Sequence, residues 1–275
     1  MDVESTMTVN EPKVKFAFGQ NWKRFLPMVD DERITLARQS LTTMLKTSLA
    51  GKTFIDIGCG SGLFSLSAKL EGATVTSFDV DNDSVQCCEE LKSRFFKTDS
   101  EWHIFKGSAL DKKMLQGLGT FDVVYSWGVL HHTGHMWDTF ENVVGLVKND
   151  GRLYIAIYND QGAASRRWFT VKRLYNNSNS LGRFFILSLA TFRLWGPTIL
   201  KDLFKGNPFR TLNNYKARGM SAWRDVVDWV GGYPFEVAKP EEVFNFFYQR
   251  GFELITLETC AGGLGCNSFV FQRKK

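Results

Sequence analysis

The residues best suited to chemistry form a glycine-rich turn early in the chain. Gly58, Gly60 and Gly62 follow the apolar run Phe54–Ile57 in the spacing G-x-G-x-G, and Leu63 opens a helical segment. Glycines permit a tight turn and let a ligand lie against bare backbone. The N-terminus of the following helix offers free N–H groups to a negatively charged part of that ligand. The turn is therefore a candidate binding site.

Two carboxylates accompany this turn. Asp56 stands just ahead of it, and Asp79 ends the next predicted strand, 21 residues after Gly58. An acid about 20 residues beyond such a turn typically hydrogen-bonds the hydroxyls of a ribose. A dinucleotide fingerprint would need a third glycine where Leu63 stands. The alternative interpretation is an ordinary glycine-rich turn in an α/β protein.

Alternating strands and helices must position these residues. We predict five strands before residue 160, separated by helical segments: Thr53–Ile57, Ala73–Phe78, Glu101–Phe105, Phe121–Ser126 and Gly151–Tyr158. Such β-α-β units form a parallel sheet, which binds ligands at the carboxyl ends of its strands. Near the C-terminus, a helix over Pro240–Arg250 precedes strands at Phe252–Thr259 and Asn267–Arg273. A glycine turn joins these two strands, which predicts an antiparallel pair.

Composition limits the class of protein. The chain has 275 residues, of which 44% are hydrophobic, enough for a substantial core. No run of about 18 uncharged apolar residues indicates a transmembrane helix. The five cysteines include no C-x-x-C pair, and the polar, acidic N-terminus is unlike a signal peptide. We therefore expect a cytoplasmic protein with free thiols.

The net charge of +5 is unevenly distributed. Residues 161–235 hold twelve Lys and Arg but three Asp, so this segment carries +9 and the rest of the chain −4. Fourteen aromatic residues lie between 161 and 238. The segment could bind an anionic or nucleotide-like substrate, single-stranded nucleic acid, or, through Phe184–Leu200, a membrane surface. It could equally be a helical cap whose aromatic side chains pack against the core and whose Lys and Arg side chains face solvent.

We divide the chain into four parts. Residues 1–50 form an N-terminal cap, 51–160 the cofactor-binding core, 161–238 a basic, mostly helical lid inserted after the fifth strand, and 239–275 the last helix and hairpin. Phe18 and Trp22 in the cap are candidates to close over a bound cofactor. Plain packing against the core is the alternative for both.

The order strand, G-x-G-x-G turn, helix, strand and acid resembles motif I of class I S-adenosylmethionine (SAM)-dependent methyltransferases. The resemblance implies a Rossmann-like, mostly parallel sheet of seven strands in the order 3-2-1-4-5-7-6, the last strand antiparallel. It implies SAM as cofactor and S-adenosylhomocysteine as product. The residues then expected at the cofactor are Asp56, Gly58, Cys59, Gly60, Gly62, Asp79, Val80, Ser108, Ala109, Trp127, Phe18 and Trp22. Many family members carry Asp where Ser108 stands.

A second segment, Tyr125–His135, follows the fourth strand. It resembles the small-molecule branch of the superfamily, such as the ubiquinone-pathway methyltransferases, in which this strand ends in V-L-x-H. His132 falls on that histidine. Histidine titrates near neutrality and can accept a proton from an attacking hydroxyl or amine. His131, Asp228 and Glu236 are alternative bases, and packing or capping is the alternative role for the histidines. We predict no metal, because His131 and His135 have no convincing third ligand.

Three further stretches, Arg218–Met220, Asp228–Glu236 and Cys260–Asn267, are similar to bacterial methyltransferases met among polysaccharide-biosynthesis genes. We expect methyl transfer to oxygen, with nitrogen as second choice, of a small or lipid-linked anionic metabolite such as a sugar nucleotide or glycan intermediate. We expect no stable nucleic-acid complex, and a peripheral membrane contact through the lid. The alternatives are an RNA or protein methyltransferase, against which the missing N/D-P-P-Y/F tetrapeptide argues, and a non-catalytic SAM-binding relative.

Overall fold

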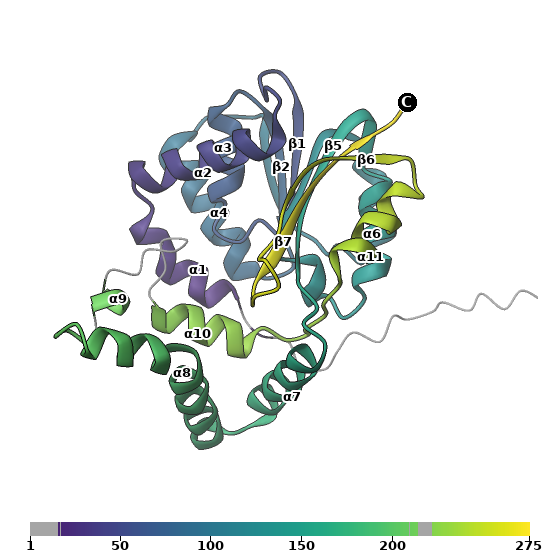
Figure 1. Ribbon diagram of the computed structural model, residues 1–275. Coiled ribbons are helices and arrows are strands. Elements are labelled where there is room, and N and C mark those ends of the chain that lie inside the picture. The colour runs from purple at the N-terminus through teal and green to yellow at the C-terminus, as the bar shows by residue number, and fades with distance from the viewer. Residues whose placement is uncertain (1–15, 17, 209, 214–221) are drawn as a thin grey trace, which may run out of the picture.

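A computed structural model describes residues 16, 18–208, 210–213 and 222–275. Residues 1–15 of the predicted cap and the stretch Arg218–Met220 lie outside the described residues. The centre of the fold is a seven-stranded sheet in the order β3-β2-β1-β4-β5-β7-β6 (Figure 1). This order confirms the sequence-based prediction.

Five strands of the sheet run parallel and two complete it as a hairpin. The parallel strands are β1 (Thr53–Ile57), β2 (Thr74–Asp79), β3 (Trp102–Lys106), β4 (Phe121–Trp127) and β5 (Val147–Tyr158). β7 (Cys266–Arg273) runs antiparallel to both β5 and β6 (Phe252–Glu258). The carboxyl ends of β1, β4 and β5 therefore meet the start of β7 at one edge of the sheet.

Helices cover both faces of the sheet, which explains why most residues of its central strands β1 and β4 are buried, whichever face they lie on. On one face, α2 (Asp31–Leu45), α3 (Leu63–Leu70) and α4 (Asn82–Phe95) pack around Phe54, Val123 and Tyr154. On the other face, α5 (Lys112–Gly117), α6 (Met136–Val144) and α11 (Pro240–Tyr248) pack around Ile55 and Phe269.

The chain enters the core through a short helix that we did not predict, α1 (Gly19–Phe25), followed by a 3-10 turn over Leu26–Met28. α1 has seven residues and no side-chain cap, so its sequence signal is weak. Contacts with α4 hold it instead: Gly19 N–H donates to Asp81 (2.8 Å), and Lys23 pairs with Asp83 (2.8 Å). The next helix, α2, ends at Leu45, because Lys46 adopts a left-handed conformation.

The described residues between β5 and α11 form four helices: α7 (Ala163–Asn177), α8 (Ser180–Leu203), α9 (Arg210–Asn213) and α10 (Ala222–Gly231). The insertion leaves and rejoins the core at one point. Ala238 N–H donates to Tyr158 O (3.0 Å), and Asp160 N–H donates to Ala238 O (3.1 Å). Figure 1 shows these helices grouped at the end of the sheet where the parallel strands terminate. Within the described residues, no helix combines the length and apolar character needed to cross a membrane.

A half-buried polar cluster fixes the opposite end of the sheet. Asp122 at the start of β4 accepts hydrogen bonds from the backbone N–H (2.9 Å) and hydroxyl (2.7 Å) of Thr53 in β1, and from Lys148 in β5 (2.9 Å). Burial alone would raise the pKa of Asp122, but the hydrogen bonds from Lys148 and Thr53 outweigh it and lower the pKa to about 2. The cluster therefore ties together the starts of three neighbouring strands.

We expect Asp122→Asn to lower the free energy of unfolding by about 1–2 kcal/mol at neutral pH, because a charge-assisted acceptor is lost. The folded-state pKa lies below the ordinary value of 3.8, so this contribution is present above pH 3.8 and is lost as the pH falls towards about 2. Guanidinium unfolding of both proteins at neutral pH and about pH 3 measures the difference. If the difference in free energy of unfolding between wild type and Asp122→Asn is as large at about pH 3 as at neutral pH, the charged role of Asp122 is contradicted.

Candidate functional site

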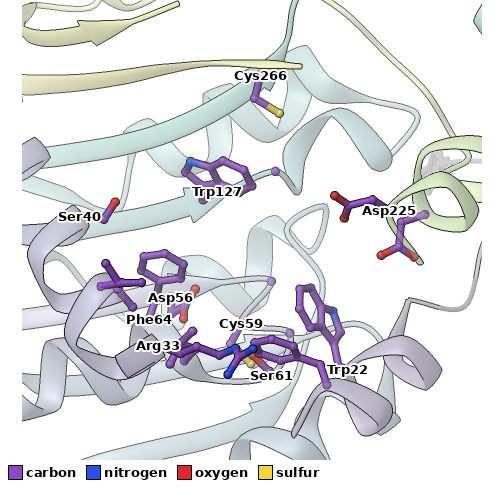
Figure 2. A pocket seen from close by; sticks show the side chains of 18 of the residues that line it. Trp22, Arg33, Ser40, Asp56, Cys59, Ser61, Phe64, Trp127, Asp225 and Cys266 are labelled. Atoms are coloured by element: carbon purple, nitrogen blue, oxygen red, sulfur yellow. The ribbon is translucent and has the colours of Figure 1, made fainter. Parts of the chain in front are cut away.

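A cavity of about 660 Å³ opens at the carboxyl ends of β1, β4 and β5 (Figure 2). Its volume lies within the range of about 300–1,000 Å³ typical of small-molecule sites. The core contributes the glycine turn and strand ends, while α2 and α10 form opposite walls. The side chains and backbone that line it include Trp22, Arg33, Asp56, Gly58, Cys59, Gly60, Tyr125, Trp127, Tyr158, Asp225, Asp228, Trp229 and Cys266.

The glycine turn can be built only from glycine. Gly58, Gly60 and Gly62 have φ of 77°, 54° and 81°, a region that side chains disfavour. A Cβ on Gly58 would lie 2.4 Å from Val129, and one on Gly62 would lie 2.7 Å from the Cys88 sulfur. The turn therefore exposes backbone at the cavity and lets α3 approach α4 closely.

Two buried carboxylates hold the turn. Asp79 accepts hydrogen bonds from Gly60 N–H (3.0 Å) and Asp81 N–H (2.9 Å), so the end of β2 supports the turn directly. Asp56 accepts from the Ser65 hydroxyl (2.5 Å) at the start of α3. Burial raises the pKa of Asp79, and it raises the pKa of Asp56 to about 7, with a smaller contribution from the neighbouring Asp79 charge. Asp79 has oxygen lone pairs left for further donors.

Three residues of the cavity wall carry buried polar atoms that lack a hydrogen-bond partner among the described residues. These atoms are the Arg33 Nε, the Tyr125 hydroxyl and the Trp229 Nε1. Buried polar groups in proteins are almost always paired, so these three atoms are exceptions in the cavity wall. We did not predict these residues, because only the tertiary structure brings α2, β4 and α10 to one cavity.

The predicted cofactor residues divide into two groups. Six line the cavity: Asp56, Gly58, Cys59, Gly60, Trp127 and Trp22, whose indole lies against Gly60. Six do not: Gly62, Asp79, Val80, Ser108, Ala109 and Phe18.

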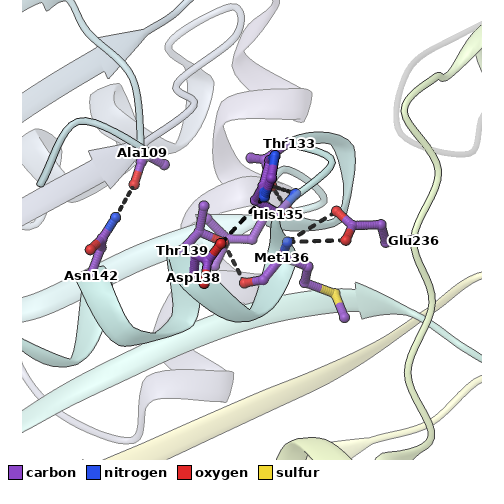
Figure 3. A network of polar contacts seen from close by, with 9 residues as sticks. Ala109, Thr133, His135, Met136, Asp138, Thr139, Asn142 and Glu236 are labelled. Carbon is purple, nitrogen blue, oxygen red and sulfur yellow. Dashed lines mark hydrogen bonds and ion pairs between the residues drawn. The ribbon is translucent and has the colours of Figure 1, made fainter. Parts of the chain in front are cut away.

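The second group still surrounds the turn and the ends of β2 and β3. Val80 is exposed beside Asp79, and the Ser108 hydroxyl accepts a hydrogen bond from Leu110 N–H (3.2 Å). Ala109 O accepts from the Asn142 side chain (2.9 Å; Figure 3). The Phe18 ring packs against His132, with 5.0 Å between ring centroids.

Both predicted histidines lie outside the cavity lining, in the 3-10 turn Leu130–His132. His132 Nδ1 lies 2.6 Å from Pro234 O, an acceptor, so Nδ1 carries the proton. Burial lowers the pKa of His132 to about 3, although this hydrogen bond opposes the shift. His131 is fully buried, with its ring 4.0 Å from that of Tyr158. Burial lowers its pKa well below the ordinary value.

The two predicted acids are placed differently. Glu236 accepts hydrogen bonds from Met136 N–H at the start of α6 (3.1 Å to each oxygen), where it caps the helix away from the cavity (Figure 3). Asp228 on α10 lines the cavity and accepts a hydrogen bond from the Asn21 side chain of α1. Of the four predicted bases, Asp228 is the one in the cavity wall.

A buried lysine stands behind this wall, and the sequence analysis did not single it out. Lys172 on α7 is fully buried, donates to Trp229 O, and lies over the rings of Trp229 (4.4 Å) and Phe235 (4.6 Å). Burial lowers the pKa of Lys172 to about 7, and the nearby Asp228 opposes that shift. The side chain joins α7 to α10 behind the ring of Trp229.

No group of three or more His, Cys, Asp or Glu in the described part of the chain is arranged to hold a metal ion. The five cysteines are all free thiols, and Cys59 and Cys266 line the cavity.

Comparison with known proteins finds a family match in the core of the fold. Residues 55–153 match a family described as "Methyltransferase domain". A ubiquinone biosynthesis O-methyltransferase of Vibrio parahaemolyticus is 28% identical over 111 residues, covering 40% of this chain and 46% of that protein. A tRNA U34 carboxymethyltransferase of Pseudoalteromonas translucida is 28% identical over 147 residues, covering 54% of this chain and 44% of that protein. The chain thus spans less than half the length of these relatives.

One solved structure extends the likeness of fold to nearly the whole chain. Magnesium protoporphyrin IX methyltransferase from Synechocystis PCC 6803, crystallised with bound S-adenosylhomocysteine, superposes with a TM-score of 0.53 over 93% of this chain and 94% of that one. The sequence identity is 14%, so the similarity establishes the fold.

Lys172→Met tests the buried cation. The folded-state pKa of about 7 lies below the ordinary value of 10.5, so charging the lysine opposes folding at pH values below 10.5. Between pH 7 and pH 10.5, Lys172 is protonated in the unfolded chain and largely neutral in the folded protein. The free energy of unfolding of the wild type should therefore rise relative to Lys172→Met by about 1.4 kcal/mol per pH unit above neutrality. Guanidinium unfolding at several pH values measures this slope, and parallel profiles for the two proteins would refute it.

Proposed function

Because the core of this chain is a methyltransferase domain with the class I SAM-dependent fold, we propose that the protein transfers a methyl group from SAM to an acceptor oxygen, with nitrogen as second choice. The observation that carries the proposal is the cavity itself: a glycine turn, a ribose-type acid beneath it, and unpaired polar atoms in its wall. SAM supplies an activated methyl group on a positively charged sulfur.

The chain offers a group for each part of SAM. The backbone at Gly58 and Gly60 gives room for the methionine portion, and the Arg33 guanidinium, whose Nη1 pairs with Asp30, is a counter-charge for its carboxylate. Asp79 supports the turn and accepts from the ribose hydroxyls. Carboxylates and aromatic rings in the wall, among them Asp56 and Trp127, suit the positive sulfur.

We assign proton acceptance to Asp228. It lines the cavity, and a carboxylate held by Asn21 can take the proton of an acceptor hydroxyl as the oxygen attacks the methyl carbon. His132 is a poorer candidate, because its pKa of about 3 makes it a weak base and its ring is not part of the cavity lining. Alignment of methyl donor and acceptor in the enclosed cavity supplies most of the rate increase.

The charge pattern refines the expected acceptor. Among the described residues that line the cavity, Arg33 is the one basic residue, beside acids that include Asp56, Asp225 and Asp228. An uncharged hydroxyl or amine therefore suits the cavity, while the anionic part of a sugar nucleotide or lipid-linked glycan intermediate would lie outside it, along the basic insertion. The acceptor we propose is thus a small or lipid-linked metabolite whose reactive end is neutral.

Asp79→Ala tests cofactor binding. Loss of a charged acceptor for two ribose hydroxyls should weaken SAM binding about 10- to 100-fold, since such hydrogen bonds contribute roughly 1.5–3 kcal/mol. Calorimetric titration of SAM into wild type and variant measures the change, with circular dichroism as a check that the turn still folds. Unchanged affinity would remove Asp79 from the ribose role.

Asp228→Asn tests the base, with Glu236→Gln as the comparison carboxylate. Loss of general-base catalysis should reduce kcat at least about 100-fold while SAM affinity is kept. Glu236→Gln should lower the melting temperature through the weakened α6 cap and leave kcat of the folded protein unchanged. The assignment fails if Asp228→Asn keeps its kcat, or if His132→Ala loses kcat with its fold intact.

The acceptor is identified by incubating the purified protein with methyl-labelled SAM and a fractionated extract of its host. Label in the lipid or small-molecule pool supports the proposal and provides a compound to identify. Label in RNA or protein overturns it in favour of a macromolecular acceptor. SAM binding with no label in any pool would indicate a non-catalytic relative.

A further inference from the structure

Helix α8 carries apolar side chains on two opposite faces. Toward the protein, Leu187, Ala190 and Leu194 belong to a cluster with Val226 and Val230 of α10, which fixes α8 to the rest of the insertion. A helix that is apolar all round is normally buried. Here only one face is covered by the described protein.

The other face bears five large apolar side chains at helical spacing, which we call the outer stripe: Leu181, Phe184, Phe185, Leu189 and Phe192. Residues three, four, eight and eleven positions apart fall on one side of a helix. Leu189 is 71% exposed and Phe192 75% exposed. Beyond Pro197, the exposed Leu200 and Leu203 continue the apolar surface to Phe204, which is 90% exposed. Figure 1 places α8 at the rim of the molecule, beyond α10 as seen from the sheet.

The charges around the outer stripe have one sign. Seven Lys and Arg side chains of α7, α8 and the residues after α8 are exposed: Arg166, Arg167, Arg173, Arg183, Arg193, Lys201 and Lys205. Within the described part of the chain, none of them forms a salt bridge. The acid between them, Asp202, is buried and accepts hydrogen bonds from Thr211.

The outer stripe and the basic side chains around it together indicate whether a second copy of the chain or a lipid surface covers this face. A second copy of the chain would bring the basic side chains of both copies together, and that repulsion opposes association. Exposed phenylalanines and leucines beside unpaired Lys and Arg are instead the features of a helix that lies in the interface of an anionic bilayer. We propose that the outer stripe docks this protein onto an anionic lipid surface.

Docking would bring the cavity close to the membrane. α10 separates the two: Val226 and Val230 pack towards α8, whereas Asp225, Asp228 and Trp229 line the cavity. An acceptor anchored in the bilayer could then present its hydroxyl to the cavity while its anionic linker stays beside the basic helices. This use of the surface rests on the proposed function, but the docking itself does not.

The test is flotation of the full-length protein with vesicles of phosphatidylcholine alone or mixed with phosphatidylglycerol, without SAM or acceptor. We expect binding to the anionic vesicles that weakens with added salt. Phe184→Ser/Phe192→Ser should weaken partitioning roughly 10-fold for each phenylalanine. Arg193→Gln/Lys201→Gln should weaken binding to the anionic vesicles roughly 30-fold, at about 1 kcal/mol per charge, and leave binding to pure phosphatidylcholine unchanged. Tyr248→Ser, on an exposed aromatic of α11, is the matched control and should bind as the wild type does.

Because all the substituted side chains are exposed, the variants should keep the wild-type melting temperature, which scanning calorimetry verifies. The proposal is overturned if the wild type does not float with anionic vesicles, or if the double phenylalanine variant floats equally well. It is also overturned if the wild type is a dimer in light scattering and the double variant a monomer, since the stripe would then join two copies. The flotation test does not depend on methyl transfer. A protein that floats with anionic vesicles but transfers no methyl group would support docking and contradict the proposed function.

Discussion

The close approach of neighbouring side chains to the bare backbone of the glycine turn is the constraint on which the site depends. Side chains at positions 58, 60 and 62 would collide with Val129, Trp22 and Cys88. Asp79 holds the turn from the neighbouring strand through Gly60 N–H, so the residue suited to a ribose also shapes the wall beside it. The parallel strand order makes this possible, because it brings the ends of β1 and β2 side by side.

The far wall of the cavity is held by interactions of a different kind. α10 is fixed by Lys172 behind Trp229, by Asn21 at Asp228 and by apolar packing on α8. A buried lysine without a carboxylate partner within ion-pair distance is costly. Its hydrogen bond to Trp229 O and the surrounding rings offset part of that cost, and together they join α7 to the wall of the cavity.

Charge is separated across the insertion. The cavity side presents acids such as Asp225 and Asp228. On the outer helices α7 and α8, the exposed charged side chains are all Lys or Arg. The basic excess visible in the composition therefore belongs to an outer surface rather than to the cavity. This arrangement suits a positively charged cofactor inside and an anionic surface or linker outside, and it explains how one segment can serve both.

Local patterns in the sequence determined the parallel sheet, the antiparallel final pair and the glycine turn, because they follow from the alternation of strands and helices and from residues that tolerate left-handed backbone. The strand order followed from the resemblance to class I SAM-dependent methyltransferases. The sequence could not place the side chains that long-range packing brings together. His132 matched a family pattern but packs against Phe18 outside the cavity lining, and Glu236 caps α6, whereas Asp228 reaches the cavity. Arg33 and Lys172 carry no local signal, since burial and missing partners exist only once α2, α7 and α10 surround the strand ends. Tertiary structure alone decided these roles, because burial sets both the pKa values and the access to the cavity.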